Sequence, residues 1–268
     1  MYNLSWLTDI HLDHLSLPKV LEFCKSINES NSDGFLITGD ISNARFLTSH
    51  LTVVANEIKK PIYYVLGNHD LWGSSRDYVY SELSRLNISN LIFLDINKEI
   101  KLTLDTYLIG HSGWYDLING DYKHSGFFPN GMPEFRFVSD FLGLSPNDKK
   151  QKCEAWTKEA ADHLEINLVM ALEKEDCKTV YCGTHVPPYR EASWYMGKMS
   201  NDEGAPFFSN KIIGDRLSEV MKSYPDKELI VLAGHTHDVC LYKPAQNITV
   251  HVAPAEYGNP AIYKTFSI

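Results

Sequence analysis

Short apolar runs alternate with amphipathic stretches along the N-terminal part of the chain. Residues 2–8, 35–39 and 61–66 are apolar and rich in β-favouring residues, which predicts buried strands. Between these runs, residues 17–30 and 43–58 carry apolar side chains at helical spacing. The order of strand, helix, strand, helix and strand predicts βαβ winding with parallel strands.

The rest of the chain continues this pattern and ends rich in β-structure. Residues 74–86 predict a helix, 91–94 a short strand, and 99–109 a hairpin that turns at 104–106. Helices are further expected over 148–175 and 212–224, and strands over 178–184, 229–233, 239–242, 248–252 and 261–268. Proline and glycine separate the last three strands, so we expect a mostly antiparallel ending.

Two long segments show little periodicity. Residues 112–147 are rich in Gly, Pro, Asp, Asn and aromatic residues, and residues 186–210 are similarly irregular. Irregular segments of this length in a compact domain usually border a site or form a lid. Because the sequence contains no internal repeat or linker, we expect a single domain over 1–268, with these two segments as lid or substrate-facing loops.

Composition allows a large buried core and narrows the class of function. Hydrophobic residues make up 44% of the chain and aromatic residues 12%, which excludes disorder by composition. The formal net charge of -9 argues against a surface that binds DNA or RNA backbones. No apolar run approaches the roughly 18 residues of a membrane span, so no membrane partner is expected.

The cysteines and the N-terminus indicate the compartment. The chain has 5 cysteines, an odd number, and no C-x-x-C pair. This pattern argues against a disulfide scaffold and favours a reduced, cytoplasmic location. The N-terminus lacks the basic flank and long apolar segment of a signal peptide, which favours the same location.

Polar side chains follow the apolar runs where the predicted strands end. The run that stops at Gly67 is followed at once by Asn68, His69 and Asp70. Similar positions after other runs are occupied by Asp9, His11, Asp40, His185, His235 and His237. Because ligands of α/β sheets collect outside the carboxyl ends of the strands, we expect these side chains to form one site.

The residue types at these strand ends predict a metal site. Oxygen and imidazole ligands without thiolate suit Mn, Fe, Zn, Co or Ni and argue against a structural zinc finger. The candidate ligands are too many for one ion: Asp9, His11, Asp40, Asn68, His185, His235 and His237. Two ions that share a carboxylate would use all of them, and Asp40 is the natural bridge. Such a centre keeps a net positive charge of about one or two, which attracts a phosphate oxyanion.

The ordered motifs resemble those of a known family. Asp9-x-His11, Gly39-Asp40, Gly67-Asn68-His69-Asp70, His185 and Gly234-His235-Thr236-His237 resemble the calcineurin-like metallophosphoesterases, and they span most of the chain. The resemblance implies an α/β fold, a four-layer αββα sandwich of two mixed β-sheets flanked by helices. It also implies that Asp9, His11, Asp40 and His237 hold one metal ion. Asp40, Asn68, His185 and His235 would hold the second.

His69 is predicted to act in catalysis rather than as a ligand. It follows Asn68 directly, and Asp70 could accept its second ring N–H and favour the imidazolium. The imidazolium would then protonate the leaving alkoxide. The resemblance supports this acid role and implies attack by a metal-bound hydroxide.

Residues near the motifs are candidates for substrate contacts. Members of the family often carry another acid soon after Gly39-Asp40, whereas this chain has Ile41-Ser42-Asn43, which makes Asn43 a candidate contact. Arg45, Arg76 and Arg190 follow the motifs closely and are candidates to clamp a phosphate, with surface ion pairs as the alternative. An aromatic rim is expected from some of Trp72, Trp114, Tyr115, Tyr189, Trp194 and Tyr195.

The leading hypothesis is a phosphoesterase that uses two metal ions. The acidic composition and the irregular segments favour a phosphodiester or another small phosphorylated substrate over a nucleic acid polymer. A broad phosphomonoesterase or phosphoprotein phosphatase would fit the same residues. A metal-binding scaffold without turnover is a hypothesis of another class, but such a protein should have lost a ligand or the acid histidine, and here none is missing.

Overall fold

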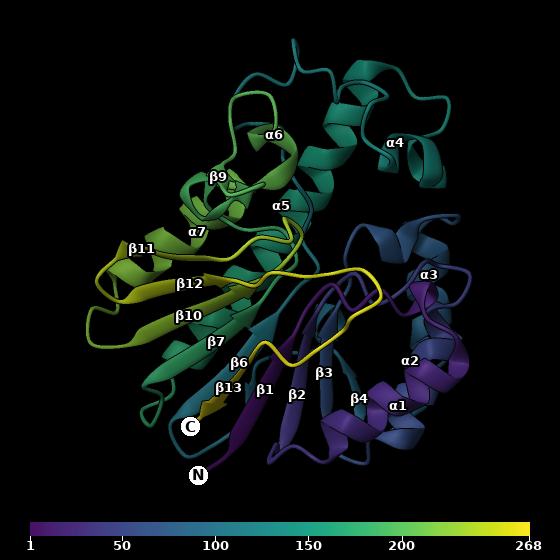
Figure 1. Ribbon diagram of the computed structural model, residues 1–268. Coiled ribbons are helices and arrows are strands. Elements are labelled where there is room, and N and C mark those ends of the chain that lie inside the picture. Colours follow the sequence, from purple (N-terminus) through teal and green to yellow (C-terminus); the bar gives the residue numbers. More distant parts are fainter.

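Two β-sheets lie face to face at the centre of the protein, and helices cover their outer faces (Figure 1). The computed structural model describes residues 1–268. The first sheet has the order β13 (Lys264–Ser267), β1 (Asn3–Leu7), β2 (Gly34–Thr38), β3 (Ile62–Val65) and β4 (Leu91–Phe93). The second has the order β11 (Cys240–Ala245), β12 (Ile248–Val252), β10 (Glu228–Ala233), β7 (Thr179–Gly183), β6 (Thr106–Gly110) and β5 (Ile100–Lys101).

Both sheets mix parallel and antiparallel pairs. Strands β1 to β4 run parallel, as βαβ winding requires, and β13 joins β1 antiparallel. In the second sheet β6, β7, β10 and β12 are parallel, while β5 and β11 form antiparallel edges. The C-terminal strands are therefore less antiparallel than expected, because β12 pairs with β10 by a parallel ladder.

Three hydrophobic clusters correspond to the three interfaces of a four-layer sandwich. The first packs the helices α1 (Leu17–Asn28), α2 (Leu47–Glu57) and α3 (Arg76–Ser84) against the first sheet. The second packs α5 (Pro146–Leu172) and α7 (Lys211–Lys222) against the second sheet. The third lies between the sheets and contains Trp6, Leu108 and Leu232. The predicted αββα sandwich of two mixed sheets is confirmed.

Helix α2 begins later than the apolar spacing predicts. Residues 43–46 form a turn in which the N–H groups of Phe46 and Leu47 both donate to the Asn43 carbonyl, each at 3.0 Å. The helix therefore starts at Leu47 instead of residue 43. No helix of the structure has the length and apolar character that crossing a membrane requires.

The two irregular segments contain only short elements. Residues 112–147 hold α4 (Glu134–Phe137) and a 3-10 turn (Ser139–Phe141), and the long helix α5 begins at Pro146, within the last two residues of this segment. Residues 186–210 hold the hairpin of β8 (Trp194–Tyr195) and β9 (Lys198–Met199), followed by α6 (Ala205–Phe208). In Figure 1, α4, α6 and β9 lie at the upper end of the molecule, beyond the ends of the central strands.

Candidate metal centre

Every candidate ligand stands just after the carboxyl end of a central strand. Asp9 and His11 follow β1, Asp40 follows β2, and Asn68 follows β3. From the second sheet, the loop after β7 contributes His185 and the loop after β10 contributes His235 and His237. These strands are parallel within each sheet, so both sheets deliver their loops to one edge of the sandwich.

Four of these side chains form a compact group. Ligand atoms of Asp9, His11, Asp40 and His237 all lie within 4.8 Å of one another. His237 Nε2 is 3.1 Å from Asp9 Oδ1 and 3.3 Å from His11 Nε2. A tetrahedral ion with bonds of about 2.1 Å separates its ligand atoms by about 3.4 Å, so the spacing suits such an ion.

A second group gathers around the side-chain oxygen of Asn68. His235 Nδ1 lies 2.9 Å from Asn68 Oδ1, and His185 Nε2 lies 3.0 Å from the same oxygen. The other ring nitrogens are used as donors, since His235 Nε2–H reaches the Phe207 carbonyl at 2.9 Å and His185 Nδ1–H reaches the Thr38 carbonyl at 2.8 Å. In the neutral rings the nitrogens that face Asn68 therefore carry lone pairs, and a cation would satisfy three acceptors at once.

The Asp40 carboxylate lies between the two groups. Its Oδ1 is 3.4 Å from His185 Nε2, and its Oδ2 is 3.8 Å from His11 Nε2. The backbone N–H of His69 also donates to Oδ1 at 2.8 Å, which holds the carboxylate in this orientation. The two oxygens therefore face different groups, as a bridging ligand requires.

Unusual backbone conformations concentrate at the candidate ligands. Apart from glycines, the residues with positive φ are Asp9, His11, Asp40, Leu117, Met196, His235 and His237. The left-handed region costs a non-glycine residue on the order of 1–3 kcal/mol and is typical of functional sites. Most of these strained positions belong to the predicted ligands. The surrounding fold therefore holds the ligand residues in a backbone conformation that they would not favour by themselves.

Two motif glycines allow the loops to approach one another. Gly39 has φ +91°, and a Cβ there would lie 2.6 Å from both Gly67 N and His185 Nδ1. A Cβ on Gly67 would collide with the Asp40 carboxylate. Glycine before Asp40 and before Asn68 therefore lets the two strand ends and His185 share one small volume.

The electrostatics of the centre favour added positive charge. Burial opposes ionisation of Asp40, but the neighbouring imidazoles of His69 and His185 hold the pKa of Asp40 well below its ordinary value. Burial lowers the pKa of His235 to about 4, so that its ring is neutral. Although burial also disfavours the charged form of His185, the carboxylates of Asp40 and Asp9 raise the pKa of His185 to about 10. The buried carboxylates thus stabilise a positive charge, which a metal ion would supply.

His69 lies beside the compact group, and its side chain is 13% exposed. Its imidazole stacks on the Trp72 indole, with centroids 3.5 Å apart and planes at 23°. His69 Nε2 lies 3.8 Å from Asp40 Oδ2. The stacked indole limits the rotation of the ring and keeps it next to the candidate bridge.

The predicted contact between Asp70 and His69 is wrong. Asp70 Oδ1 accepts the backbone N–H groups of Ile41 and Ser42 at 2.9 and 2.8 Å, and Oδ2 accepts that of Gly67 at 2.7 Å. Asp70 is fully buried and ties the loop after β2 to the loop after β3. Its carboxylate therefore supports the two loops that carry Asp40 and Asn68 and does not act on His69.

Glu134 is a site residue that the sequence pattern did not predict. Its Oε1 accepts a hydrogen bond from Asn68 Nδ2, and the residue is only 1% exposed. Because the amide nitrogen of Asn68 points to Glu134, its oxygen points to His185 and His235. Glu134 thus orients Asn68 so that its side-chain oxygen is available as a metal ligand. Glu134 itself comes from the irregular segment 112–147.

A cavity of about 310 Å³ lies over the candidate centre. We call it the central cavity; its lining includes Asp40, Asn68, His69, Trp72, Phe127, Met132, Pro133, Glu134, Tyr195, Phe208, His235, Thr236, His237 and Tyr257. Both irregular segments contribute to this lining.

Of the expected aromatic rim, Trp72 and Tyr195 line the central cavity, whereas Trp114 and Tyr115 are buried in the core. Tyr257, whose ring lies 4.4 Å from that of His11, was not anticipated.

The structure does not bring the predicted substrate contacts Asn43, Arg45, Arg76 and Arg190 to the central cavity. Asn43 Nδ2 donates to Asp13 at 3.0 Å, Arg190 pairs with Asp202 at 2.7 Å, and Arg45 is exposed. Arg76 comes nearest, because it lines a separate cavity of about 10 Å³ that also touches Asn68 and His185.

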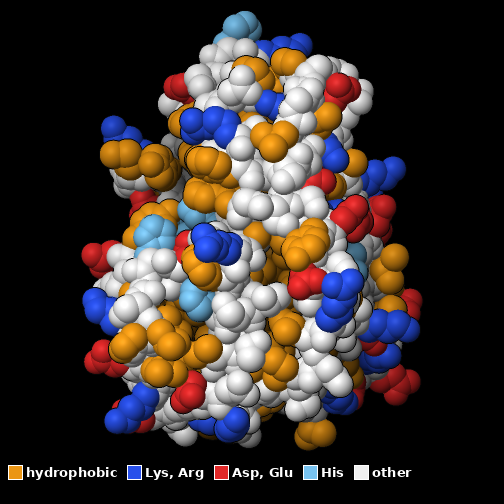
Figure 2. Space-filling model, turned by 90° about the vertical axis from the view of Figure 1, so that its right-hand side faces the viewer, with side chains coloured by type: hydrophobic (Ala, Val, Ile, Leu, Met, Phe, Trp, Pro, Cys, Tyr) orange, Lys and Arg blue, Asp and Glu red, His pale blue; other side chains and the backbone are white.

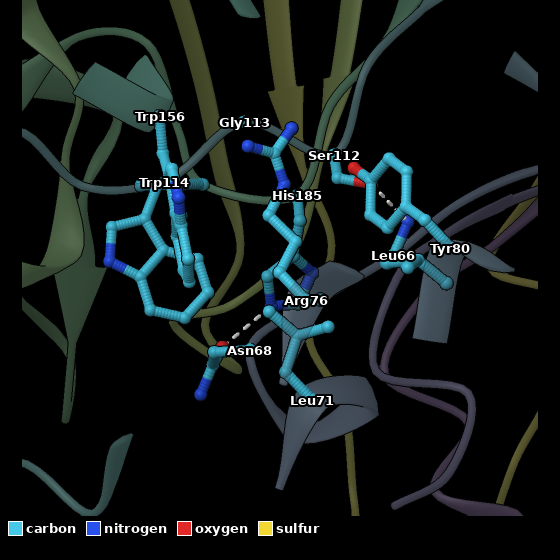
Figure 3. A pocket seen from close by; sticks show the side chains of 12 residues that line it. Leu66, Asn68, Leu71, Arg76, Tyr80, Ser112, Gly113, Trp114, Trp156 and His185 are labelled. Carbon is cyan, nitrogen blue, oxygen red and sulfur yellow. Dashed lines mark hydrogen bonds between the residues drawn. The ribbon is translucent and has the colours of Figure 1, made fainter. Parts of the chain in front are cut away.

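The Arg76 guanidinium is held by other partners. Figure 3 shows its side chain between the indoles of Trp114 and Trp156 and the ring of Tyr80. It donates to both Glu159 oxygens, at 2.7 and 2.8 Å, and lies 4.8 Å from the centre of the Tyr80 ring. The neighbouring cavity has room for about one water, so a phosphate group does not fit beside Arg76. In this structure Arg76 therefore serves the packing behind His185.

The sandwich and the cluster of Asp, Asn and His side chains at its edge are typical of metal-dependent hydrolases. In a comparison with protein families, the model of the calcineurin-like phosphoesterases matches residues 6–239. The chain therefore belongs to this family. The resemblance seen in the motifs is thereby confirmed.

Solved structures with the same fold include phosphatases. A phosphopantetheinyl hydrolase from Mycobacterium tuberculosis is 15% identical with a TM-score of 0.60, and the match covers 95% of this chain and 89% of that chain. A dimetal phosphatase from Danio rerio is 13% identical with a TM-score of 0.57, covering 94% and 86%. No curated protein sequence matches this chain. At these identities the solved structures show a shared fold.

Proposed function

We propose that this protein hydrolyses a phosphodiester bond in a small substrate with the help of two metal ions. The observation that carries the proposal is the convergence of the ring nitrogens of His185 and His235 on the side-chain oxygen of Asn68, with Asp40 beside them. When bound there, metal ions would act as Lewis acids on a phosphoryl oxygen and supply a water nucleophile at neutral pH.

The two groups of side chains define which residues would hold each ion. Asp9, His11, Asp40 and His237 would hold the first, and Asp40, Asn68, His185 and His235 the second. The donor set is oxygen and imidazole, which suits Mn, Fe, Zn, Co or Ni. These ligands fit two ions because Asp40 presents one oxygen to each group.

In this proposal His69 donates a proton to the leaving oxygen of the substrate. Its ring lines the central cavity and is held by the Trp72 stack close to Asp40, where the phosphoryl group would bind. An imidazole is well suited to this transfer near neutral pH. After the transfer the neutral ring can take up a proton from water that enters the cavity.

The charge of the central cavity favours a diester over a monoester. Its lining contains Asp40 and Glu134 but no lysine or arginine. A phosphodiester carries a single negative charge, whereas a monoester carries up to two, and here only the metal ions would offset that charge. A volume of about 310 Å³ also suits a small molecule rather than a folded phosphoprotein.

An activity assay across substrate classes tests this proposal. Purified protein should hydrolyse bis-nitrophenyl phosphate when manganese is added, should lose this activity with a chelator, and should act more slowly on nitrophenyl phosphate. Faster hydrolysis of the monoester would favour the phosphomonoesterase alternative. If both ions are bound and no ester is hydrolysed, the protein is a metal-binding scaffold.

Replacement of Glu134 tests how Asn68 is oriented. Glu134→Ala removes the acceptor for Asn68 Nδ2, so the amide can rotate and present nitrogen to His185 and His235. Changes to residues that orient metal ligands typically reduce affinity by roughly 10- to 100-fold, and we expect a loss in this range for one of the two ions. Titration calorimetry with manganese measures the two affinities.

Glu134→Gln is the matched control for this experiment. Its side-chain carbonyl can still accept the hydrogen bond from Asn68, so its metal affinities should stay closer to those of the unmodified protein. Equal and large losses in both variants would contradict the orienting role. Unchanged affinities in Glu134→Ala would contradict it as well.

A further inference from the structure

A second cavity, which we call the outer cavity, shares part of its lining with the central cavity. The second, of about 410 Å³, is lined by Phe127, Tyr195, Met196, Lys198, Met199, Ser200, Asn201, Glu203, Gly204 and Phe208. Three aromatic residues, Phe127, Tyr195 and Phe208, line both cavities. We call these three residues the aromatic wall, because they form the boundary that the two cavities share.

The aromatic wall offers ring faces and exposed apolar surface. The rings of Tyr195 and Phe208 stack with centroids 5.2 Å apart and planes at 27°, and Phe127 packs edge-on against Phe208 at 6.0 Å. Tyr195 is 47% exposed, whereas tyrosine side chains are usually more buried than this. Figure 2 shows orange hydrophobic side chains next to pale-blue histidines at mid-height on the face turned to the viewer.

Hydrogen bonds link the aromatic wall to the candidate ligands. The carbonyl of Phe207, directly before Phe208, accepts the Nε2–H of His235 at 2.9 Å. The N–H of Gly197, in the turn of the β8–β9 hairpin after Tyr195, donates at 2.6 Å to Asp238, which follows His237. Phe208 and Tyr195 are therefore held in place by hydrogen bonds to residues at or beside the candidate ligands. These hydrogen bonds fix how far the two rings lie from the candidate centre.

We propose that the substrate carries an aromatic or heteroaromatic ring that binds against the aromatic wall while its phosphodiester group lies at the candidate centre. This inference rests on the proposed function and names the substrate class for that site. Flat rings gain most from stacking on Tyr195 and Phe208, and base-aromatic stacking changes affinity by roughly 5- to 150-fold per ring.

The outer cavity favours such a ring over a long aliphatic chain. Beyond the aromatic wall its lining includes Lys198 and Asn201, whose side-chain N–H groups can donate to the polar edge of a heteroaromatic group. An aliphatic chain has no acceptor for these donors and gains nothing from them. The outer cavity thus combines stacking surface near the centre with hydrogen-bonding groups farther out.

Three diesters with the same leaving group test this inference. Methyl, cyclohexyl and naphthyl nitrophenyl phosphates differ only in the second ester group, so differences in kcat/KM report the binding of that group. We expect the naphthyl ester to exceed the cyclohexyl and methyl esters by roughly 5- to 100-fold, mainly through KM. Equal values for naphthyl and cyclohexyl esters would overturn the proposal, because they would show that only apolar bulk is recognised.

Variants of the aromatic wall locate the effect. Tyr195→Ala should reduce the preference for the naphthyl ester over the methyl ester to a few-fold, and because Tyr195 is 47% exposed the variant should fold normally. Tyr78→Ala, at a 60% exposed tyrosine on α3, is the matched control and should retain the preference. A preference that persists in Tyr195→Ala and Phe208→Ala would overturn the proposal.

A binding measurement separates this inference from the proposed function. If none of the esters is hydrolysed, the proposed function fails, and titration calorimetry with naphthyl methyl phosphate then decides the inference by itself. Tighter binding of this compound than of dimethyl phosphate, lost in Tyr195→Ala, supports the aromatic wall as a ring site. Equal binding of the two compounds contradicts it.

Discussion

Asp40→Asn should abolish most activity and reduce the metal content of the protein from two ions per chain to one or fewer. The amide oxygen can still accept the N–H of His69, so the loop after β2 should keep its conformation. The charge that would bridge both ions is lost, and several kcal/mol of transition-state stabilisation correspond to a decrease on the order of 10³-fold in kcat/KM. Plasma mass spectrometry and a diesterase assay measure the two effects.

The control for Asp40→Asn is Asp105→Asn. Asp105 lies in the turn between β5 and β6 and pairs with Lys178 at the surface, far from the candidate centre in the sequence and in the fold. This variant should bind two ions and keep its activity. An Asp40→Asn protein that still held both ions and turned over substrate would show that Asp40 is not a shared ligand.

His69→Ala should leave both metal ions in place and lose turnover selectively. The backbone N–H that supports Asp40 is unaffected by the change, whereas the ring stacked on Trp72 is removed. General acid catalysis contributes roughly 10²- to 10⁴-fold, and this loss should appear with alkyl leaving groups, which need a proton. With nitrophenolate, a stable anion, the loss should be much smaller. Steady-state rates across a series of leaving groups measure this difference.

His124→Ala serves as the matched control for His69→Ala, because the His124 side chain is 84% exposed and pairs only with Asp121. Its rates should equal those of the unmodified protein for every leaving group. A uniform loss across leaving groups in His69→Ala would contradict the acid role and favour a role in binding the phosphoryl group. Loss of metal in this variant would make His69 a supporting residue of the centre.

Placement of the candidate ligands could be predicted from the sequence because it depends on a simple property of the fold. Apolar runs that end in glycine and a polar residue mark the carboxyl ends of parallel strands, and these ends meet at one edge. Asp40 and Asn68 could be identified in this way without knowledge of the sheet order. The two sheets bring His185 and His235 to the same edge for the same reason.

Contacts that depend on loop packing could not be predicted in this way. Glu134 lies 66 positions from Asn68 in a segment without periodicity, so no spacing connects them. Asp70 is adjacent to His69 in sequence, but the short helical turn after Asn68 points its carboxylate toward Gly67 and the loop after β2. Tyr257 comes from the C-terminal part of the chain, where nothing in the sequence indicates that it reaches the centre.

The lack of lysine and arginine in the lining of the central cavity also became visible only in three dimensions. Arginines near the motifs in sequence suggested phosphate clamps, yet Arg76 and Arg190 are paired with Glu159 and Asp202. Ion pairing satisfies these side chains locally, since an unpaired guanidinium packed against aromatic rings would lose hydration. The positive charge that binds substrate is therefore expected to come from metal ions.

X-ray anomalous diffraction from crystals grown with manganese is the most direct test of the central claim that these side chains hold two ions. We predict two anomalous peaks about 3.5–4 Å apart, one beside Asp9 and His237 and one beside Asn68 and His185, with Asp40 between them. A single peak, or peaks away from these residues, would contradict the account.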